Sequence, residues 1–128
     1  MSSLSEHSPL IILVEDDEPI AEVIEMVLSE EIHCRIHCFT HGRDALRSVK
    51  AIPPSLFILD YQLPSMSGLQ LYDSLQQMEH VKAIPTIMMS ANLPWNELAQ
   101  RHIVGLQKPF ELDDLVHLVK QMLQSPSS

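Results

Sequence analysis

Short apolar runs alternate with segments of helical periodicity, and this pairing occurs five times along the chain. Apolar or alternating stretches predict strands over residues 10–14, 33–39, 56–59, 85–90 and 103–107. Apolar residues spaced three and four apart predict helices over residues 20–28, 42–50, 71–78, 94–100 and 112–123. Strands and helices that alternate in this way indicate the α/β class, here a doubly wound, five-stranded parallel sheet with right-handed crossovers and five flanking helices.

Three of these segments carry a further expectation about burial. Residues 10–14 are apolar without interruption, as in a parallel strand covered on both faces. Residues 33–39 alternate instead, which favours an edge strand with Cys34, Ile36 and Cys38 on one side. The cysteines are too far apart along a strand to form a disulfide, so we expect buried free thiols and a reducing compartment, the cytoplasm. The first helix is expected to face the sheet with one apolar stripe, formed by Ile20, Val23, Ile24, Val27 and Leu28.

Composition narrows the class of protein. The chain has 128 residues, a length that suits one domain. Its net charge of −9 opposes direct binding to nucleic acids or anionic membranes, which are negatively charged as well. Its three glycines exclude Gly-rich dinucleotide and phosphate loops, and its longest aliphatic run, residues 10–14, is far too short for membrane insertion. We therefore expect one domain over residues 10–124, between a flexible N-terminus (1–9) and a flexible tail (125–128), with no output domain after it.

Chemically reactive side chains stand where the predicted strands end. The acidic residues 15–17 follow the first strand, Asp60 follows the third, Ser90 ends the fourth and Lys108 follows the fifth. In doubly wound sheets, functional groups gather at the carboxyl ends of the strands. Carboxylates crowded there repel one another unless a cation is present, and an oxygen-rich site of this kind suits Mg²⁺. The sequence therefore predicts a magnesium site at this edge of the sheet.

These residues resemble the receiver domain of two-component response regulators. The resemblance covers residues 10–123 and depends on four short motifs, each at the end of its own strand. The motifs are Ile-Leu-Val-Glu-Asp-Asp (12–17), Leu-Asp-Tyr-Gln-Leu-Pro (59–64) with Gly68, Met-Ser-Ala (89–91) and Lys-Pro-Phe (108–110). The resemblance implies the flavodoxin-like strand order 2-1-3-4-5. It also implies a phosphorylation-controlled binding module that is not an enzyme, since it promotes only its own phosphorylation and dephosphorylation.

The resemblance assigns a role to each acidic residue. Asp60 would take a phosphoryl group from a sensor histidine kinase or a phosphotransfer protein. Mg²⁺ would be held by Asp16, Asp60 and the backbone carbonyl of Gln62, with Glu15 acting through a water. Judged from the residues alone, Asp16 and Asp17 could be the acidic pair instead. A first strand that ends as predicted favours Glu15 and Asp16, and leaves Asp17 to begin the first helix, where its charge suits the helix dipole.

Lys108 and Ser90 complete the implied site. Lys108 would contact one phosphoryl oxygen, Ser90 would donate a hydrogen bond to another, and the small Ala91 leaves room for the group. The Lys108–Pro109 peptide bond is often cis in this family. A downstream protein, which the sequence does not name, would read the phosphorylated state of a chain that is a monomer or a weak dimer.

Two features depart from the family pattern. Receivers carry Tyr or Phe three residues before the lysine, where this chain has Gly105, and the interval from Ser90 to Lys108 is short, so we expect a truncated fourth helix. Because the ring of the usual switch is missing, we expect output through a different surface or a weaker switch. The lone tryptophan, Trp95, lies in this segment, either packed against the last helix or exposed as a partner-binding anchor.

Two other functions stay open at this point. The missing aromatic residue is compatible with a degenerate receiver, which would act unmodified as a constitutive interaction module. The acidic, hydroxyl and lysine residues are all present, however, and they favour retained chemistry. A phosphatase with an Asp nucleophile, similar to haloacid dehalogenases, would need a second Asp two residues after the first, where this chain has Gln62.

Overall fold

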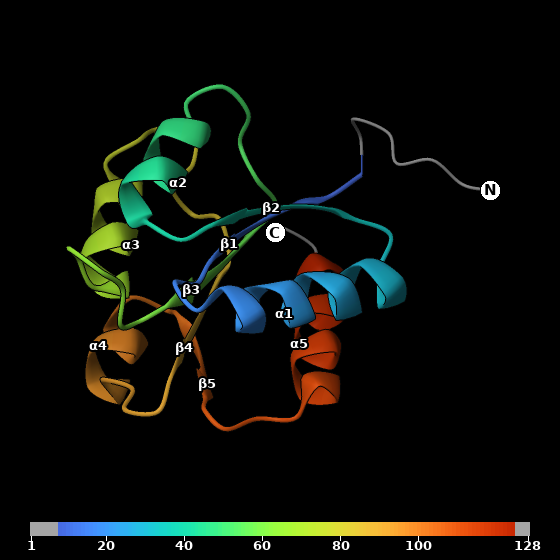
Figure 1. Cartoon of the computed structure of the whole chain (residues 1–128). Coiled ribbons are helices and arrows are strands. Elements are labelled where there is room, and N and C mark those ends of the chain that lie inside the picture. The colour runs from blue at the N-terminus through green and yellow to red at the C-terminus, as the bar shows by residue number, and fades with distance from the viewer. Residues whose placement is uncertain (1–7, 125–128) are drawn as a thin grey trace.

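The computed structural model describes residues 8–124, so residues 1–7 and the predicted tail at 125–128 lie outside the described range. Its strands are β1 (Leu10–Val14), β2 (Arg35–Phe39), β3 (Leu56–Asp60), β4 (Thr86–Ser90) and β5 (Val104–Gln107). Its helices are α1 (Glu18–Glu31), α2 (Gly42–Ser48), α3 (Gly68–Gln76), α4 (Trp95–Gln100) and α5 (Leu112–Gln124). The strands form one parallel sheet in the order β2-β1-β3-β4-β5 (Figure 1), which confirms the expected fold.

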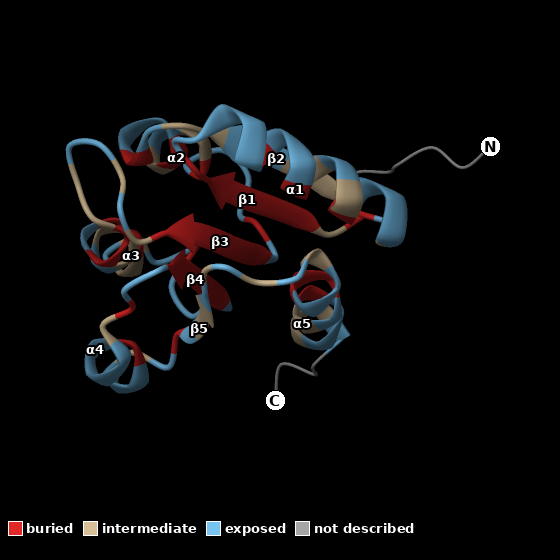
Figure 2. Ribbon diagram, turned by 60° about the horizontal axis from the view of Figure 1, so that its bottom comes forward, coloured by how far each residue is buried: buried red, intermediate tan, exposed pale blue. Residues whose placement is uncertain are grey.

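Two layers of helices cover the sheet. α2, α3 and α4 lie on one face, and α1 and α5 lie on the other (Figure 1). Side chains of β1 alternate between the layers, because Ile12 packs with α2 and α3 whereas Ile11 and Leu13 pack with α1 and α5. The three inner strands, red in Figure 2, are buried along their whole length. The continuous apolar pattern of residues 10–14 thus reflects cover on both faces.

The strand order brings the carboxyl ends of β1 and β3 together. The chain runs from β1 outward to β2 and then returns to β3 on the other side of β1, which makes this pair of strands the switch point of the fold. Val14 of β1 is level with Leu59 of β3, and Asp60 is level with Met89 of β4. The residues that follow β1 therefore lie beside Asp60.

β2 is an edge strand, as its alternating pattern predicted, but its two neighbouring cysteines differ in burial. Both thiols are free, and Cys34 is buried as expected. The expectation is wrong for Cys38, which is exposed because an edge strand has a neighbour on one side only. Although the residue as a whole is exposed, its Sγ lies 3.5 Å from Oε1 of Glu25, and the partial loss of hydration around the thiol together with that negative charge raises the pKa of Cys38 to about 12.

Residues before β1 are held against β2. The backbone carbonyl of Ser8 accepts a hydrogen bond from the Arg35 guanidinium at 2.7 Å, and the carbonyl of Pro9 accepts one from the Arg35 N–H at 2.8 Å. Ser8 is buried in this position. Ser8 and Pro9, which fall in the N-terminal segment 1–9 that is expected to be flexible, are thus bonded to the first residue of β2.

The apolar stripe of α1 is wider than the surface that the helix buries. Ala21, Ile24 and Leu28 are buried, whereas the side chains of Ile20 and Val23 are 38% and 42% exposed. The expectation that the whole stripe faces the sheet is therefore wrong for Ile20 and Val23. They lie along a groove between α1 and the turn that joins β5 to α5, where no other element within residues 8–124 covers them.

α4 has six residues, as the short interval after β4 predicted. Trp95, its first residue, lies over Gly105 of β5 and is 52% exposed. Packing against the last helix, one of the two expectations, is wrong, because α4 and α5 lie on opposite faces of the sheet. The Trp95 ring is therefore partly buried, since it lies against β5 and is also exposed to solvent.

Candidate functional site

Three carboxylates meet at the carboxyl edge of the sheet. Glu15 and Asp16 follow β1, Asp60 ends β3, and each offers an oxygen that lies within 4.8 Å of the other two. Glu15 and Asp60 are 1% and 5% exposed, whereas Asp16 is exposed. The adjacency of β1 and β3 thus brings together the acidic residues that the sequence analysis selected.

Lys108 reaches into this cluster from the end of β5. Its Nζ lies 2.9 Å from Oε1 of Glu15 and 3.5 Å from Oδ2 of Asp60. Its backbone N–H donates to the carbonyl of Ser90 at 2.9 Å, so the ends of β4 and β5 are joined beside the site. The peptide bond between Lys108 and Pro109 is cis, as the resemblance implied.

Ser90 is the buried hydroxyl of the site. It ends β4 and is 1% exposed. Its Oγ accepts a hydrogen bond from the backbone N–H of Asn92 at 3.1 Å. The hydroxyl proton is available to a second acceptor, since a serine can accept and donate at the same time.

The charges in the cluster do not balance, because three carboxylates face one ammonium group. Burial is the main reason that the pKa of Glu15 is raised, and the adjacent Asp60 carboxyl group adds to the effect. Loss of hydration lowers the pKa of Lys108, but the hydrogen bond with Glu15 and the nearby carboxylate charges outweigh it, so this pKa is raised overall. Lys108 therefore stays protonated, and the site keeps an excess of negative charge.

Asp17 belongs to the helix and not to the acidic pair. Its carboxylate caps α1 by accepting a hydrogen bond from the Ile20 N–H at 3.2 Å. Its own backbone N–H donates to Oε2 of Glu15 at 3.2 Å. Of the two registers that the sequence left open, the structure has Glu15 and Asp16 beside Asp60, with Asp17 beginning the helix.

The loop after β3 orients Asp60. The backbone N–H of Gln62 donates to Oδ1 of Asp60 at 3.1 Å. A capping box closes the loop at the start of α3, where the Ser67 hydroxyl accepts from the Gln70 N–H and the Gln70 side chain accepts from the Ser67 N–H. Gly68 lies directly against this strand end, since a Cβ on it would be 2.5 Å from the carbonyl oxygen of Asp60.

Sequence reasoning did not assign three of these contributions. The backbone N–H groups of Gln62 and Asn92 donate hydrogen bonds to the side chains of Asp60 and Ser90. Every residue except proline has such a group, so the residue types do not show which ones take part. The close approach of Gly68 did have a signal. A glycine that ends a loop of Pro and Ser, next to a reactive strand end, is typical of a position where two backbones touch.

The profile of the response regulator receiver domain matches residues 11–120. The chain belongs to this family. The receiver is 30% identical over 120 residues to the phosphate regulon transcriptional regulatory protein PhoB of Rhizobium meliloti, covering 91% of this chain and 52% of PhoB. It is 28% identical over 116 residues to the DNA-binding transcriptional regulator NtrC of Proteus hauseri, covering 87% of this chain and 24% of NtrC. It thus spans about half of one relative and a quarter of the other.

A solved structure with the same fold comes from Pseudomonas aeruginosa. The receiver domain of sensor histidine kinase PA1611, which has a magnesium ion coordinated in its active-site cleft, superposes with a TM-score of 0.81 at 25% identity. The superposition covers 92% of this chain and 99% of that one. Within residues 8–124 of the present receiver, no helix is long and apolar enough to cross a membrane.

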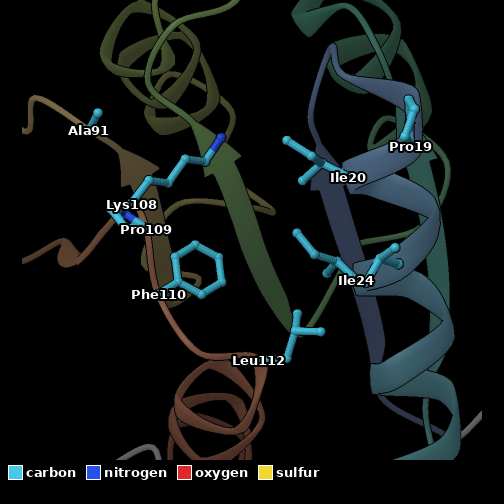
Figure 3. A pocket seen from close by; sticks show the side chains of 9 residues that line it. Pro19, Ile20, Ile24, Ala91, Lys108, Pro109, Phe110 and Leu112 are labelled. Atoms are coloured by element: carbon cyan, nitrogen blue, oxygen red, sulfur yellow. The ribbon is translucent and has the colours of Figure 1, made fainter.

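An apolar groove of about 600 Å³ opens next to the acidic cluster of the receiver. Figure 3 shows Ile20 and Ile24 of α1 on one side, facing Phe110 of the turn after β5 and Leu112, the first residue of α5, on the other. Ala91 and Lys108 line the groove as well, so it is continuous with the end of the sheet where the acidic cluster lies.

Proposed function

We propose that this receiver accepts a phosphoryl group on Asp60 and in that state changes its affinity for a downstream protein. The observation that supports the proposal is the buried Asp60 carboxylate, 3.5 Å from Nζ of Lys108 and beside two further carboxylates. The donor is a phosphohistidine of a sensor histidine kinase or phosphotransfer protein. A carboxylate oxygen of Asp60 attacks the phosphorus, and the bond from phosphorus to the histidine nitrogen breaks. Its electron pair stays on that nitrogen, and Asp60 becomes an acyl phosphate.

The acidic residues fit a magnesium ion, which we propose as the cofactor. Glu15, Asp16 and Asp60 offer clustered carboxylate oxygens, and the carbonyl of Gln62 belongs to the loop that follows Asp60. A set of oxygen donors with excess negative charge is what Mg²⁺ prefers, and it lacks the thiol and imidazole ligands that softer metals select. When bound, the ion would offset the negative charges on the carboxylate and the phosphoryl group. The magnesium coordinated in the PA1611 receiver is in line with this assignment.

Lys108 and Ser90 would hold the transferred group. The Lys108 ammonium, which lies between Glu15 and Asp60, has three hydrogens to donate and can give one to a phosphoryl oxygen. The Ser90 hydroxyl would donate to a second oxygen, and the small side chain of Ala91 leaves space beside it. In this proposal the receiver has no separate substrate. It promotes its own phosphorylation and the later hydrolysis of the acyl phosphate in the cytoplasm.

The alternatives are less well supported by the geometry. A degenerate, constitutive module would not need buried carboxylates converging with a lysine at a switch point, and this convergence favours retained chemistry. A phosphatase of the haloacid dehalogenase type would need an acidic side chain at residue 62. Gln62 instead contributes its backbone N–H to Asp60.

The direct test is the mass of the intact protein after incubation with acetyl phosphate and Mg²⁺. We expect a gain of one phosphoryl group that disappears when EDTA is added before the donor, because without the cation the carboxylates repel the incoming phosphate. A protein that gains no mass under conditions that load an established receiver in parallel would contradict the proposal and favour the constitutive module.

We further propose that the apolar groove receives the phosphohistidine-bearing partner. A protein that delivers a histidine to Asp60 has to cover the edge where Ala91 and Lys108 join the groove to the site. The groove is almost entirely apolar, and the exposed Glu18 and Glu22 lie on the helix that forms one wall. A partner surface with an apolar ridge flanked by basic residues would complement both features.

Shortening two side chains that line the groove is expected to weaken docking of the partner without changing the phosphorylation chemistry at Asp60. Transfer from a phosphotransfer protein that loads the wild type should be about tenfold slower in the double variant Ile20→Ala/Val23→Ala, since two apolar contacts worth roughly 0.7 kcal/mol each are lost. Loading from acetyl phosphate should stay within about twofold, because no group of the site changes. The control is Met26→Ala, an α1 residue that is 54% exposed and does not line the groove. Equal slowing in the control would contradict the docking proposal.

A further inference from the structure

Gly105 of β5 is covered by side chains from the segment that follows β4. A Cβ atom on Gly105 would lie 2.6 Å from Cζ3 of Trp95, 2.9 Å from Cδ1 of Leu98 and 3.1 Å from Cδ1 of Leu93. Contacts this short do not occur in close-packed proteins, so the ring and a side chain at residue 105 exclude each other. The indole occupies the volume that a side chain on β5 would fill. We call this contact, between the Trp95 ring and Gly105, the indole seat.

The two ends of α4 are held in different ways. At the C-terminal end, the Arg101 guanidinium makes two hydrogen bonds to the Asp73 carboxylate at 2.9 and 3.0 Å, and the Tyr72 hydroxyl donates to the Arg101 carbonyl at 3.2 Å. At the N-terminal end, Pro94 provides no side-chain cap, and Trp95 is half exposed. Residues 91–95 therefore make fewer side-chain hydrogen bonds than the end that is fixed to α3, and Leu93 is the one of them that is buried in the core.

A short path joins the indole seat to the phosphorylation site. The Oγ of Ser90 holds the backbone N–H of Asn92 at 3.1 Å, and the next residue, Leu93, already contacts the seat. A Ser90 hydroxyl that turns to a phosphoryl oxygen on Asp60 moves the acceptor to which Asn92 is bonded. The displacement then passes along three residues to Trp95.

We propose that the indole seat is the element that changes with the state of Asp60. In the unmodified protein the ring rests on Gly105. In the phosphorylated protein, residues 91–95 are drawn toward Asp60, the ring leaves Gly105, and its apolar face is presented to solvent and to a downstream protein. This inference depends on the proposed phosphorylation of Asp60. It places output on the segment between β4 and β5, whereas the missing aromatic residue at position 105 led to the expectation of a different surface or a weaker switch.

The single tryptophan of the chain makes the test direct. Emission of Trp95 and the intact mass are followed in the same sample during incubation with acetyl phosphate and Mg²⁺. We expect the emission to shift to longer wavelength in proportion to the phosphorylated fraction. An unchanged or blue-shifted emission in protein that has gained the phosphoryl group overturns the inference and leaves the proposed function intact. Absence of any gain in mass overturns the proposed function, and this inference with it.

Two variants separate the path from the seat. Ser90→Ala, compared at equal phosphorylated fraction, should lose the emission shift, and a shift of wild-type size would show that the signal bypasses Ser90. Gly105→Ala should show the red-shifted emission without phosphorylation, because the new Cβ displaces the ring. Its control is Gly42→Ala, where the added Cβ meets the flexible Met66 side chain and the emission should not change. If circular dichroism shows that Gly105→Ala is unfolded, the wild-type and Ser90→Ala measurements still decide the inference.

Discussion

Asp60→Asn is expected to abolish the gain of a phosphoryl group from acetyl phosphate and Mg²⁺. An amide has neither the negative charge nor the nucleophilic oxygen of a carboxylate, so no acyl phosphate forms. The substitution preserves the loop, because the asparagine oxygen can still accept the Gln62 N–H that lies 3.1 Å from Oδ1 of Asp60. Mass spectrometry of the intact protein before and after incubation measures the loss.

The control for this prediction is Asp44→Asn. Asp44 is an exposed carboxylate on α2 that lies 3.6 Å from the Arg47 guanidinium, outside the acidic cluster. It should load to the same extent as the wild type. Wild-type loading of Asp60→Asn would instead identify another acceptor, and the role assigned to Asp60 would then be wrong.

The same substitution has a second readout that does not depend on phosphorylation. Carboxylates about 5 Å apart repel by roughly 3 kcal/mol at an effective dielectric constant of 20, and Asp60 faces two carboxylates and one ammonium group. Removing its charge should raise the free energy of unfolding of the metal-free protein by about 1 kcal/mol. It should also weaken the stabilisation that Mg²⁺ gives to the wild type. Urea unfolding with and without Mg²⁺ tests both statements.

Gly68→Ala is expected to lower the free energy of unfolding by about 2–3 kcal/mol and to slow phosphorylation. The added Cβ would lie 2.5 Å from the carbonyl oxygen of Asp60 and 2.9 Å from Cα of Tyr61. Both are backbone atoms, so no side-chain rotation relieves the contact, and the end of β3 must shift. Because that shift moves the nucleophile, stability and the rate of loading should fall together. Urea unfolding by circular dichroism and the time course of the mass gain measure the two effects.

Gly42→Ala is the matched control for Gly68→Ala. Gly42 is also the first residue of a helix, and a Cβ on it would come as close as 2.6 Å to a neighbouring atom. That atom is Sδ of Met66, part of a flexible side chain that can move aside. We expect stability within about 0.5 kcal/mol of the wild type and unchanged loading. A loss as large as that of Gly68→Ala would show that any side chain at a helix start is harmful, whatever it meets.

The elements and the chemistry of the site could be predicted from local pattern. An uninterrupted apolar run over residues 10–14 followed at once by acidic residues places those carboxylates just beyond a buried strand, and the run that ends at Asp60 does the same. Since parallel strands end at one edge of their sheet, these groups had to lie at that edge. The strand order, which makes β1 and β3 neighbours and so brings Glu15 to Asp60, was inferred from the family resemblance and not from the pattern.

Other features follow from packing between elements far apart in the chain. Ile20 and Val23 continue the apolar stripe of α1, and periodicity assigned them to the core, yet no element of the described part of the chain covers the groove in which they lie. From the sequence, Gly105 indicated only that the usual aromatic side chain is absent at this position. The fold shows that the Trp95 ring lies over it. Residue types and their spacing describe how side chains are distributed around their own helix or strand. They do not predict which other helix or strand packs against that element, because this depends on how separate elements pack in three dimensions.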